Sequence, residues 1–115
     1  MLLGLTTSAL QENQQRAFEL FNLGCYFDAI VSGNDVKKGK PDPEPYLLTA
    51  ARLDVNPSGA LVIEDSVNGI RSGQAAGCKV VGLTTSFKRE ILQQAGADLV
   101  IDGFNELWAL LREHR

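Results

Sequence analysis

The sequence predicts an α/β fold in which a parallel sheet is covered by helices on both faces. Short apolar runs alternate with helical stretches along the whole chain. The apolar runs are short and continuous, which is typical of strands buried on both faces. Parallel strands also need long crossover connections, and the intervening helical stretches supply them. With 115 residues, the chain is expected to form one domain spanning residues 1–115.

The first half of the chain holds two predicted strands, over residues 1–6 and 27–32, and two predicted helices. The first helix spans about residues 8–23 and begins with a capping box in which Ser8 and Gln11 stand three positions apart. The second helix follows a polar loop of residues 33–40. Asp42 is expected to cap it, and Pro43 suits its first turn because no amide donor is needed there. A turn over residues 56–59 ends this half.

The second half predicts strands over residues 60–63, 79–83 and 99–101, each followed by a helix. The helix over residues 67–76 carries Gly69 and Gly73 on one face, continued by Gly77. An interior glycine costs a helix about 1 kcal/mol, so this face is expected to pack closely against the sheet. The next helix spans residues 87–95. The last is amphipathic, with apolar residues at i, i+3, i+4 and i+7, namely Phe104, Leu107, Trp108 and Leu111.

Composition excludes several classes of function. The net charge is −3 and the pI is near 5.0, so the basic surface of a nucleic-acid-binding protein is missing. No apolar stretch reaches the roughly 18 residues that span a bilayer, and the start lacks the basic flank of a signal peptide. We therefore expect no membrane partner and a cytoplasmic location. Cys25 and Cys78 are far apart and read as free thiols, and a mechanism that needs a histidine base is disfavoured because His114 is the only histidine.

Two adjacent carboxylates, Glu64 and Asp65, end the predicted strand that precedes the glycine-rich helix. Ligands of open α/β sheets bind outside the carboxyl ends of the strands, and Mg²⁺ is held by one or two carboxylates together with substrate phosphate. Neighbouring side chains at a strand end point in different directions, so one carboxylate could ligate a metal directly and the other through water. The alternative is that Asp65 or Ser66 only caps the helix.

Lys40 and a group of hydroxyls are candidates for binding phosphate. Lys40 lies in a loop stiffened by Pro41 and Pro43, and a lysine is a good point-charge partner for phosphate. The alternative is an ordinary exposed lysine. At the turn after the first strand, hydroxyls and helix amides could bind phosphate or only cap the helix; these residues are Thr6, Thr7 and Ser8. The run Leu-Thr-Thr-Ser occurs again from Leu83, and we interpret the repetition as two similar strand-to-helix turns.

Four short motifs, taken in order, resemble the haloacid dehalogenase superfamily of phosphohydrolases. They are Leu5-Thr6-Thr7-Ser8, Tyr26-Phe27-Asp28, Lys40-Pro41-Asp42-Pro43, and Glu64-Asp65-Ser66 with Gly69 and Gly77 downstream. The nearest branch is that of small phosphatases and β-phosphoglucomutase-like enzymes. The resemblance implies a Rossmann-like core and magnesium-dependent phosphate hydrolysis or phosphoryl transfer on a small phosphorylated metabolite.

The resemblance also implies a role for each candidate residue. Thr6 would hydrogen-bond the transferring phosphoryl group, and Ser8 would lie near the substrate. Lys40 would pair with the phosphate and steady the nucleophile. Asp65 would ligate Mg²⁺, with Glu64 assisting by coordination or through water. Such roles fit phosphoryl transfer, where positioning and charge neutralisation do most of the work.

The chain departs from the family in two respects. The family's nucleophile and acid/base form an Asp-x-Asp pair on a first strand, and no such pair occurs in these residues. The cap domain that gives specificity is also absent. The sequence therefore reads as the carboxy-terminal part of a core domain, inactive or nearly so alone. The alternative is a non-catalytic module that binds phosphate, magnesium or another protein.

The absent strand would leave a gap in the sheet. In the family it lies beside the strands that end here at Thr6 and Ile63, and unpaired edges are an aggregation hazard. The gap could be filled in three ways. The sheet could close up, a second copy of the chain could contribute, or the missing segment could be supplied separately.

Overall fold

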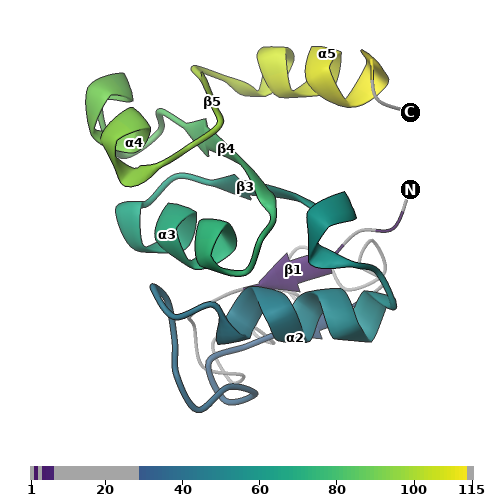
Figure 1. Ribbon diagram of the computed structural model, residues 1–115. Coiled ribbons are helices and arrows are strands. Elements are labelled where there is room, and N and C mark those ends of the chain that lie inside the picture. Colours follow the sequence, from purple (N-terminus) through teal and green to yellow (C-terminus); the bar gives the residue numbers. More distant parts are fainter. Residues whose placement is uncertain (1, 3, 7–28, 114–115) are drawn as a thin grey trace, which may run out of the picture.

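The computed structural model describes residues 2, 4–6 and 29–113, and Figure 1 shows their arrangement. Strands and helices alternate along this part of the chain, as the sequence predicts. The predicted helix over residues 8–23 lies outside the described residues. The elements are β1 (Gly4–Thr6), β2 (Ala29–Val31), α2 (Glu44–Leu53), the 3₁₀ helix η2 (Pro57–Gly59), β3 (Leu61–Glu64), α3 (Val67–Ala75), β4 (Lys79–Leu83), α4 (Arg89–Ala95), β5 (Leu99–Ile101) and α5 (Phe104–Glu113).

The described strands form two separate parallel sheets. One has the order β1-β2 and the other the order β3-β4-β5. Among the described strands, β1 pairs with β2 alone and β3 with β4 alone. Of the three ways in which the gap could be filled, closing of the sheet is therefore not seen among the described strands. The ends of β1 and β3 are linked instead by the Lys40 side chain, which bonds to the carbonyl oxygen of Thr6 and to the carboxylate of Glu64.

Helices lie on both faces of the three-stranded sheet, as predicted, although Leu61 and Ile63 of β3 stay exposed on the second face. On one face Val62 and Val80 pack with Ile70 of α3 and Leu92 of α4. On the other face a second cluster is covered by α5; its members are Val81, Leu83 and Ile101, with Leu107 and Leu110 packed against them. Four of the five β4 residues are buried, which fits a central strand.

The close approach of α3 to the sheet depends on its small residues. A Cβ at Gly73 would lie 3.0 Å from Val80 Cγ2 and 3.1 Å from Val62 Cγ1, so this glycine lets the helix lie close to β3 and β4. The helix begins at a cap in which Ser66 Oγ accepts a hydrogen bond from Gly69 N at 3.0 Å. The predicted packing reason for the glycine face is confirmed at this position.

Some details differ from the expectation. Helix α2 begins at Glu44, and its N-cap residue is Pro43, which has no side-chain oxygen to offer. Asp42 supplies the missing acceptor, because its Oδ1 accepts a hydrogen bond from Glu44 N at 2.9 Å. The Trp108 side chain is 61% exposed, since Leu107 and Leu110 make the contact with the core.

The sequence also predicts free cysteine thiols and no membrane-spanning segment. Cys78 is a buried free thiol. None of the helices in the described part of the chain is long and apolar enough to cross a bilayer.

Candidate functional site

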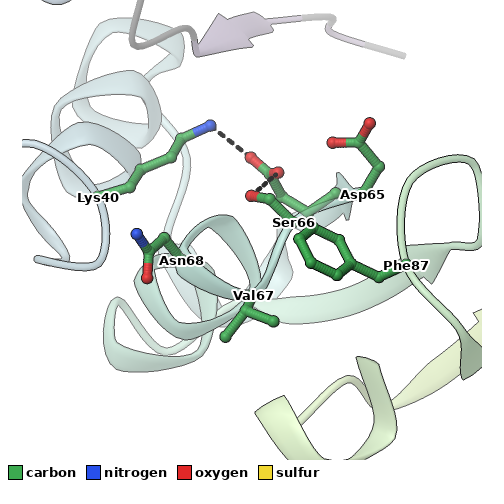
Figure 2. Close-up of a pocket in the computed structure, with 7 residues that line it drawn as sticks. Lys40, Asp65, Ser66, Val67, Asn68 and Phe87 are labelled. Atoms are coloured by element: carbon green, nitrogen blue, oxygen red, sulfur yellow. Dashed lines mark hydrogen bonds and ion pairs between the residues drawn. The ribbon is translucent and has the colours of Figure 1, made fainter. Parts of the chain in front are cut away.

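The candidate site lies where β1 and β3 end, beside the loop that precedes α2. A cavity of about 470 Å³ opens there, and Figure 2 shows its lining. Most of the lining comes from the end of β3 and the start of α3, while Lys40 reaches in from the other side. The lining residues are Lys40, Glu64, Asp65, Ser66, Val67, Asn68 and Phe87. The structure thus brings together three of the predicted site residues, namely Lys40, Glu64 and Asp65.

Lys40 is held firmly at the edge of this cavity. Its ammonium group forms an ion pair with Glu64 Oε1 and donates to the carbonyl oxygen of Thr6 at 3.2 Å. It also lies 5.1 Å from the centre of the Tyr46 ring, within the range of a cation–π contact. The side chain is only 12% exposed. An ammonium group has three donors, and the hydrogen bonds to described residues use two of them.

Glu64 is the buried carboxylate of the pair. Its Oε1 accepts hydrogen bonds from Lys40 and from the hydroxyl of Tyr46, and its Oε2 accepts one from Ser66 Oγ at 3.3 Å. Both oxygens therefore have partners within the protein. Burial, followed by the negative charge of Glu64, raises the pKa of Tyr46 well above its usual value, so this hydroxyl keeps its proton and donates it.

Asp65 points away from Glu64 and is exposed. Its Oδ2 accepts hydrogen bonds from Thr85 Oγ1 at 3.1 Å and from Ser86 Oγ at 3.2 Å. The expectation that the two adjacent carboxylates diverge is confirmed by these separate sets of partners. Capping of α3 is done by Ser66, so the capping alternative holds for Ser66 and not for Asp65.

Thr6 contributes its backbone to the site. Thr49 Oγ1 donates to the carbonyl oxygen of Pro45 at 2.8 Å, so in its 2.6 Å contact with Thr6 Oγ1 it accepts and Thr6 donates. The Thr6 hydroxyl is thus directed at α2, and the carbonyl is the group that meets Lys40. A hydroxyl contact from Thr6 to a phosphoryl group stays a prediction. Thr7 and Ser8 lie outside the described residues.

The carboxylates of the site determine how Mg²⁺ could be held. Among the described residues, no cluster of three or more His, Cys, Asp or Glu side chains is placed to hold a metal ion. Mg²⁺ in phosphate-handling sites nevertheless uses only one or two carboxylates and fills its other positions with water and phosphate oxygens. Asp65 lines the cavity and fits that requirement. Glu64 already accepts three hydrogen bonds, two at Oε1 and one at Oε2, so of the roughly four lone-pair sites of a carboxylate it has about one left for a metal.

Sequence reasoning missed several residues of this site. Tyr46 was not among the predicted site residues, and its hydroxyl reaches Glu64. Thr85 and Ser86 belong to the second Leu-Thr-Thr-Ser run, whose repetition was the available signal. Asn68 and Phe87 complete the cavity lining, and nothing in their local pattern set them apart.

Comparison with known proteins identifies the class. A family model described as haloacid dehalogenase-like hydrolase matches residues 1–83. The match covers more than half of the chain, and the chain belongs to this family.

Individual relatives agree with this assignment. The chain is 38% identical over 106 residues to a phosphoglycolate phosphatase of Salmonella typhi, covering 91% of this chain and 42% of that protein. It is 38% identical to glycerol-1-phosphate phosphohydrolase 2 of Saccharomyces cerevisiae, covering 84% of this chain and 41% of that protein. A crystal structure from Thermotoga maritima, assigned as a beta-phosphoglucomutase, superposes with a TM-score of 0.90 at 36% identity, covering 98% of this chain and 53% of that one. The chain therefore spans about half the length of the relatives that it matches.

Proposed function

We propose that this chain forms the phosphate-binding and magnesium-binding part of a phosphohydrolase that acts on a small phosphorylated metabolite. One observation carries the proposal: the Lys40 ammonium and the Asp65 carboxylate line the same cavity at the strand ends. A cation and a metal-binding carboxylate at one cavity suit the charge of a phosphate monoester. A cytoplasmic location, expected from the sequence, belongs to the same proposal.

Each residue has a defined part in this proposal. The third donor of Lys40 binds a phosphate oxygen, while Glu64 and the Thr6 carbonyl fix the direction of the ammonium group. Asp65 holds Mg²⁺, which, when bound, neutralises charge on the phosphoryl oxygens. Glu64 orients Lys40 and assists the ion by coordination or through water. Tyr46 keeps Glu64 in place.

Substrate class is inferred from the relatives. Two of them are named for hydrolysis of phosphoglycolate and of glycerol-1-phosphate, which are both small phosphate monoesters. The cavity contributes only a few non-ionic groups that could touch the rest of a substrate, among them Asn68 and Phe87. We therefore propose a small metabolite and leave its identity to a substrate screen.

Catalysis is proposed to require a second segment. The 115 residues contain no Asp-x-Asp pair, and loss of a covalent nucleophile can cost on the order of a million-fold in rate. The nucleophile would come from a further polypeptide segment that carries an Asp-x-Asp pair and lies beside β1 and β3, which do not pair with each other among the described strands. The 115-residue chain alone is expected to bind its ligands without turning them over.

The binding part of the proposal is tested with Mg²⁺ itself. Titration calorimetry on the 115-residue chain should show Mg²⁺ binding that is weakened at least tenfold by Asp65→Asn. The matched control is Asp54→Asn, an equal charge change at an exposed position at the end of α2. A second titration with inorganic phosphate in the presence of Mg²⁺ should show weaker binding in Lys40→Gln. Equal Mg²⁺ affinity in the wild-type chain and Asp65→Asn would contradict the proposed metal site.

The catalytic part is tested by hydrolysis of p-nitrophenyl phosphate. No release above background is expected from the chain alone. Release that disappears in Asp65→Asn would overturn the requirement for a second segment but keep the site. Addition of a peptide strand with an Asp-x-Asp pair then distinguishes between half of an enzyme and a non-catalytic binding module. Turnover supports half of an enzyme, and binding without turnover supports a non-catalytic module.

A further inference from the structure

We propose that Thr85 and Ser86 are positioning residues that hold the carboxylate of Asp65 in the orientation in which it binds Mg²⁺. This inference rests on the proposed function, because it concerns the same metal site. It adds two hydroxyl groups that none of the sequence motifs singled out as part of the site.

The geometry of the two hydrogen bonds carries the inference. Thr85 Oγ1 donates to Asp65 Oδ2 at 3.1 Å and Ser86 Oγ donates to the same oxygen at 3.2 Å. Within the described residues no hydrogen bond reaches Asp65 Oδ1. Both donors thus engage one oxygen and leave the other for a ligand. A carboxylate held at one oxygen presents the second in a defined direction.

The topology explains why these hydroxyls reach Asp65. Strand β4 is the hydrogen-bonded neighbour of β3, and the parallel register pairs Glu64 with Gly82. Asp65 therefore follows β3 at the level where β4 is about to end at Leu83. The turn that leads from β4 toward α4 begins directly beside it, and Thr85 and Ser86 lie in that turn.

The expected energetic effect follows from the exposure of Asp65. An exposed carboxylate samples several rotamers, and ordering it costs free energy at the moment of binding. Mg²⁺ demands near-ideal octahedral geometry, so a carboxylate that is already oriented binds it more tightly. Removing a hydrogen-bond partner from a metal ligand typically costs about 10-fold to 100-fold in metal affinity.

The experiment is titration of Mg²⁺ into the 115-residue chain and its variants. The double variant Thr85→Val with Ser86→Ala removes both hydroxyls and should weaken Mg²⁺ binding by about tenfold. Exchange of the two residues, Thr85→Ser with Ser86→Thr, keeps both hydroxyls and should retain the wild-type affinity. Thr84→Val is the matched control, because Thr84 Oγ1 bonds Asp102 Oδ1 at 2.9 Å and not Asp65. Thermal unfolding of every variant should match the wild-type chain, since these side chains are not buried.

The outcomes separate this inference from the proposed function. If Asp65→Asn loses Mg²⁺ and the double valine–alanine variant keeps wild-type affinity, Asp65 is a ligand without positioning residues and the inference is wrong. If Thr84→Val or the hydroxyl exchange weakens binding as much as the double variant, the effect is general to the turn and the inference is also wrong. If the wild-type chain binds no Mg²⁺, the proposed metal site itself fails, and this inference fails with it.

Discussion

At the scale of single residues, Gly69 shows how closely the candidate site is tied to packing. A Cβ built at this position would lie 2.0 Å from Glu64 Oε2. The glycine therefore makes room for the carboxylate under the first turn of α3. Helix α3 thus packs against Glu64, and Glu64 bonds Lys40. A substitution at Gly69 that displaces Glu64 would therefore also displace the ammonium group of Lys40.

Gly69→Ala is expected to destabilise the chain by about 1–3 kcal/mol, the usual cost of overpacking. This loss should exceed the gain of about 1 kcal/mol that alanine brings to a helix interior. The reason is that Glu64 cannot move aside without leaving Lys40 and Tyr46. Urea unfolding measures the effect. The control is Gly59→Ala, because a Cβ there has nothing within 4 Å. Equal losses in both variants would show that Glu64 has another place to go.

At the scale of elements, a network of polar groups ties β2 to α2. Asp35 Oδ2 accepts hydrogen bonds from Ser32 N at 2.7 Å and from Ser32 Oγ at 3.0 Å. Arg52 of α2 lies 3.4 Å from Asp35 Oδ1 and donates to the carbonyl oxygen of Ile30 at 2.6 Å. The last turn of the helix is thereby fastened to the strand and to the loop that follows it.

This network predicts a dependence of stability on pH. The hydrogen bond from the Ser32 backbone, followed by those from its side chain and Arg52, lowers the pKa of Asp35. In the unfolded chain the pKa of an aspartate is about 4. Because the pKa of Asp35 is lower in the folded chain, its ionised form stabilises the fold above about pH 4. This stabilisation is lost as the pH falls through the pKa that Asp35 has in the folded chain. Because Asp35 is exposed and water screens its charge, Asp35→Asn should cost less than about 1 kcal/mol at neutral pH and progressively less below about pH 4. Urea unfolding over a pH series checks this, with Asp54→Asn as the control. A cost that stays constant with pH would contradict the prediction.

The sequence predicts the bounds of a strand or helix well where each end is marked by a single clear change in residue type. The strands Lys79–Leu83 and Leu99–Ile101 lie where the sequence places them, because each is a continuous apolar run. The start of α2 is less exact. Both Asp42 and Pro43 are good residues for a helix start, and only the fold decides which one takes the cap position.

The site could be predicted in its residue types and only partly in its contacts. The pair Glu64 and Asp65 stands out in the sequence, but their partners depend on which strands are neighbours. Tyr46 lies 18 positions from Glu64, and Ser86 lies 21 positions from Asp65. Contacts over such separations leave no periodic signal. They follow from the order of the strands, which the sequence does not state.

At the scale of the whole molecule, the described strands form two small sheets that do not pair with each other. The described contacts between the two parts run through α2 and its preceding loop. The buried Ser72 Oγ of α3 donates to the carbonyl oxygen of Asp42 at 2.6 Å, Lys40 meets Glu64, and Tyr46 packs in the core of the larger sheet. Most buried side chains of that core belong to elements from β3 to β5.

This arrangement predicts unequal local stability, which native-state hydrogen exchange can measure. The amides of β4 are central in the larger sheet and should exchange most slowly, while those of β2 should exchange at a lower opening free energy. Ser72→Ala leaves the Asp42 carbonyl without its buried donor and should lower the protection of β2 and α2 by about tenfold, with a smaller change in β4. Ser58→Ala is the control, since among the described residues its hydroxyl bonds the exposed Asn56 side chain alone. Equal protection of β2 and β4, lowered equally by Ser72→Ala, would show one cooperative unit. Side-chain contacts would then couple the two sheets as strongly as backbone hydrogen bonds couple the paired strands within one sheet.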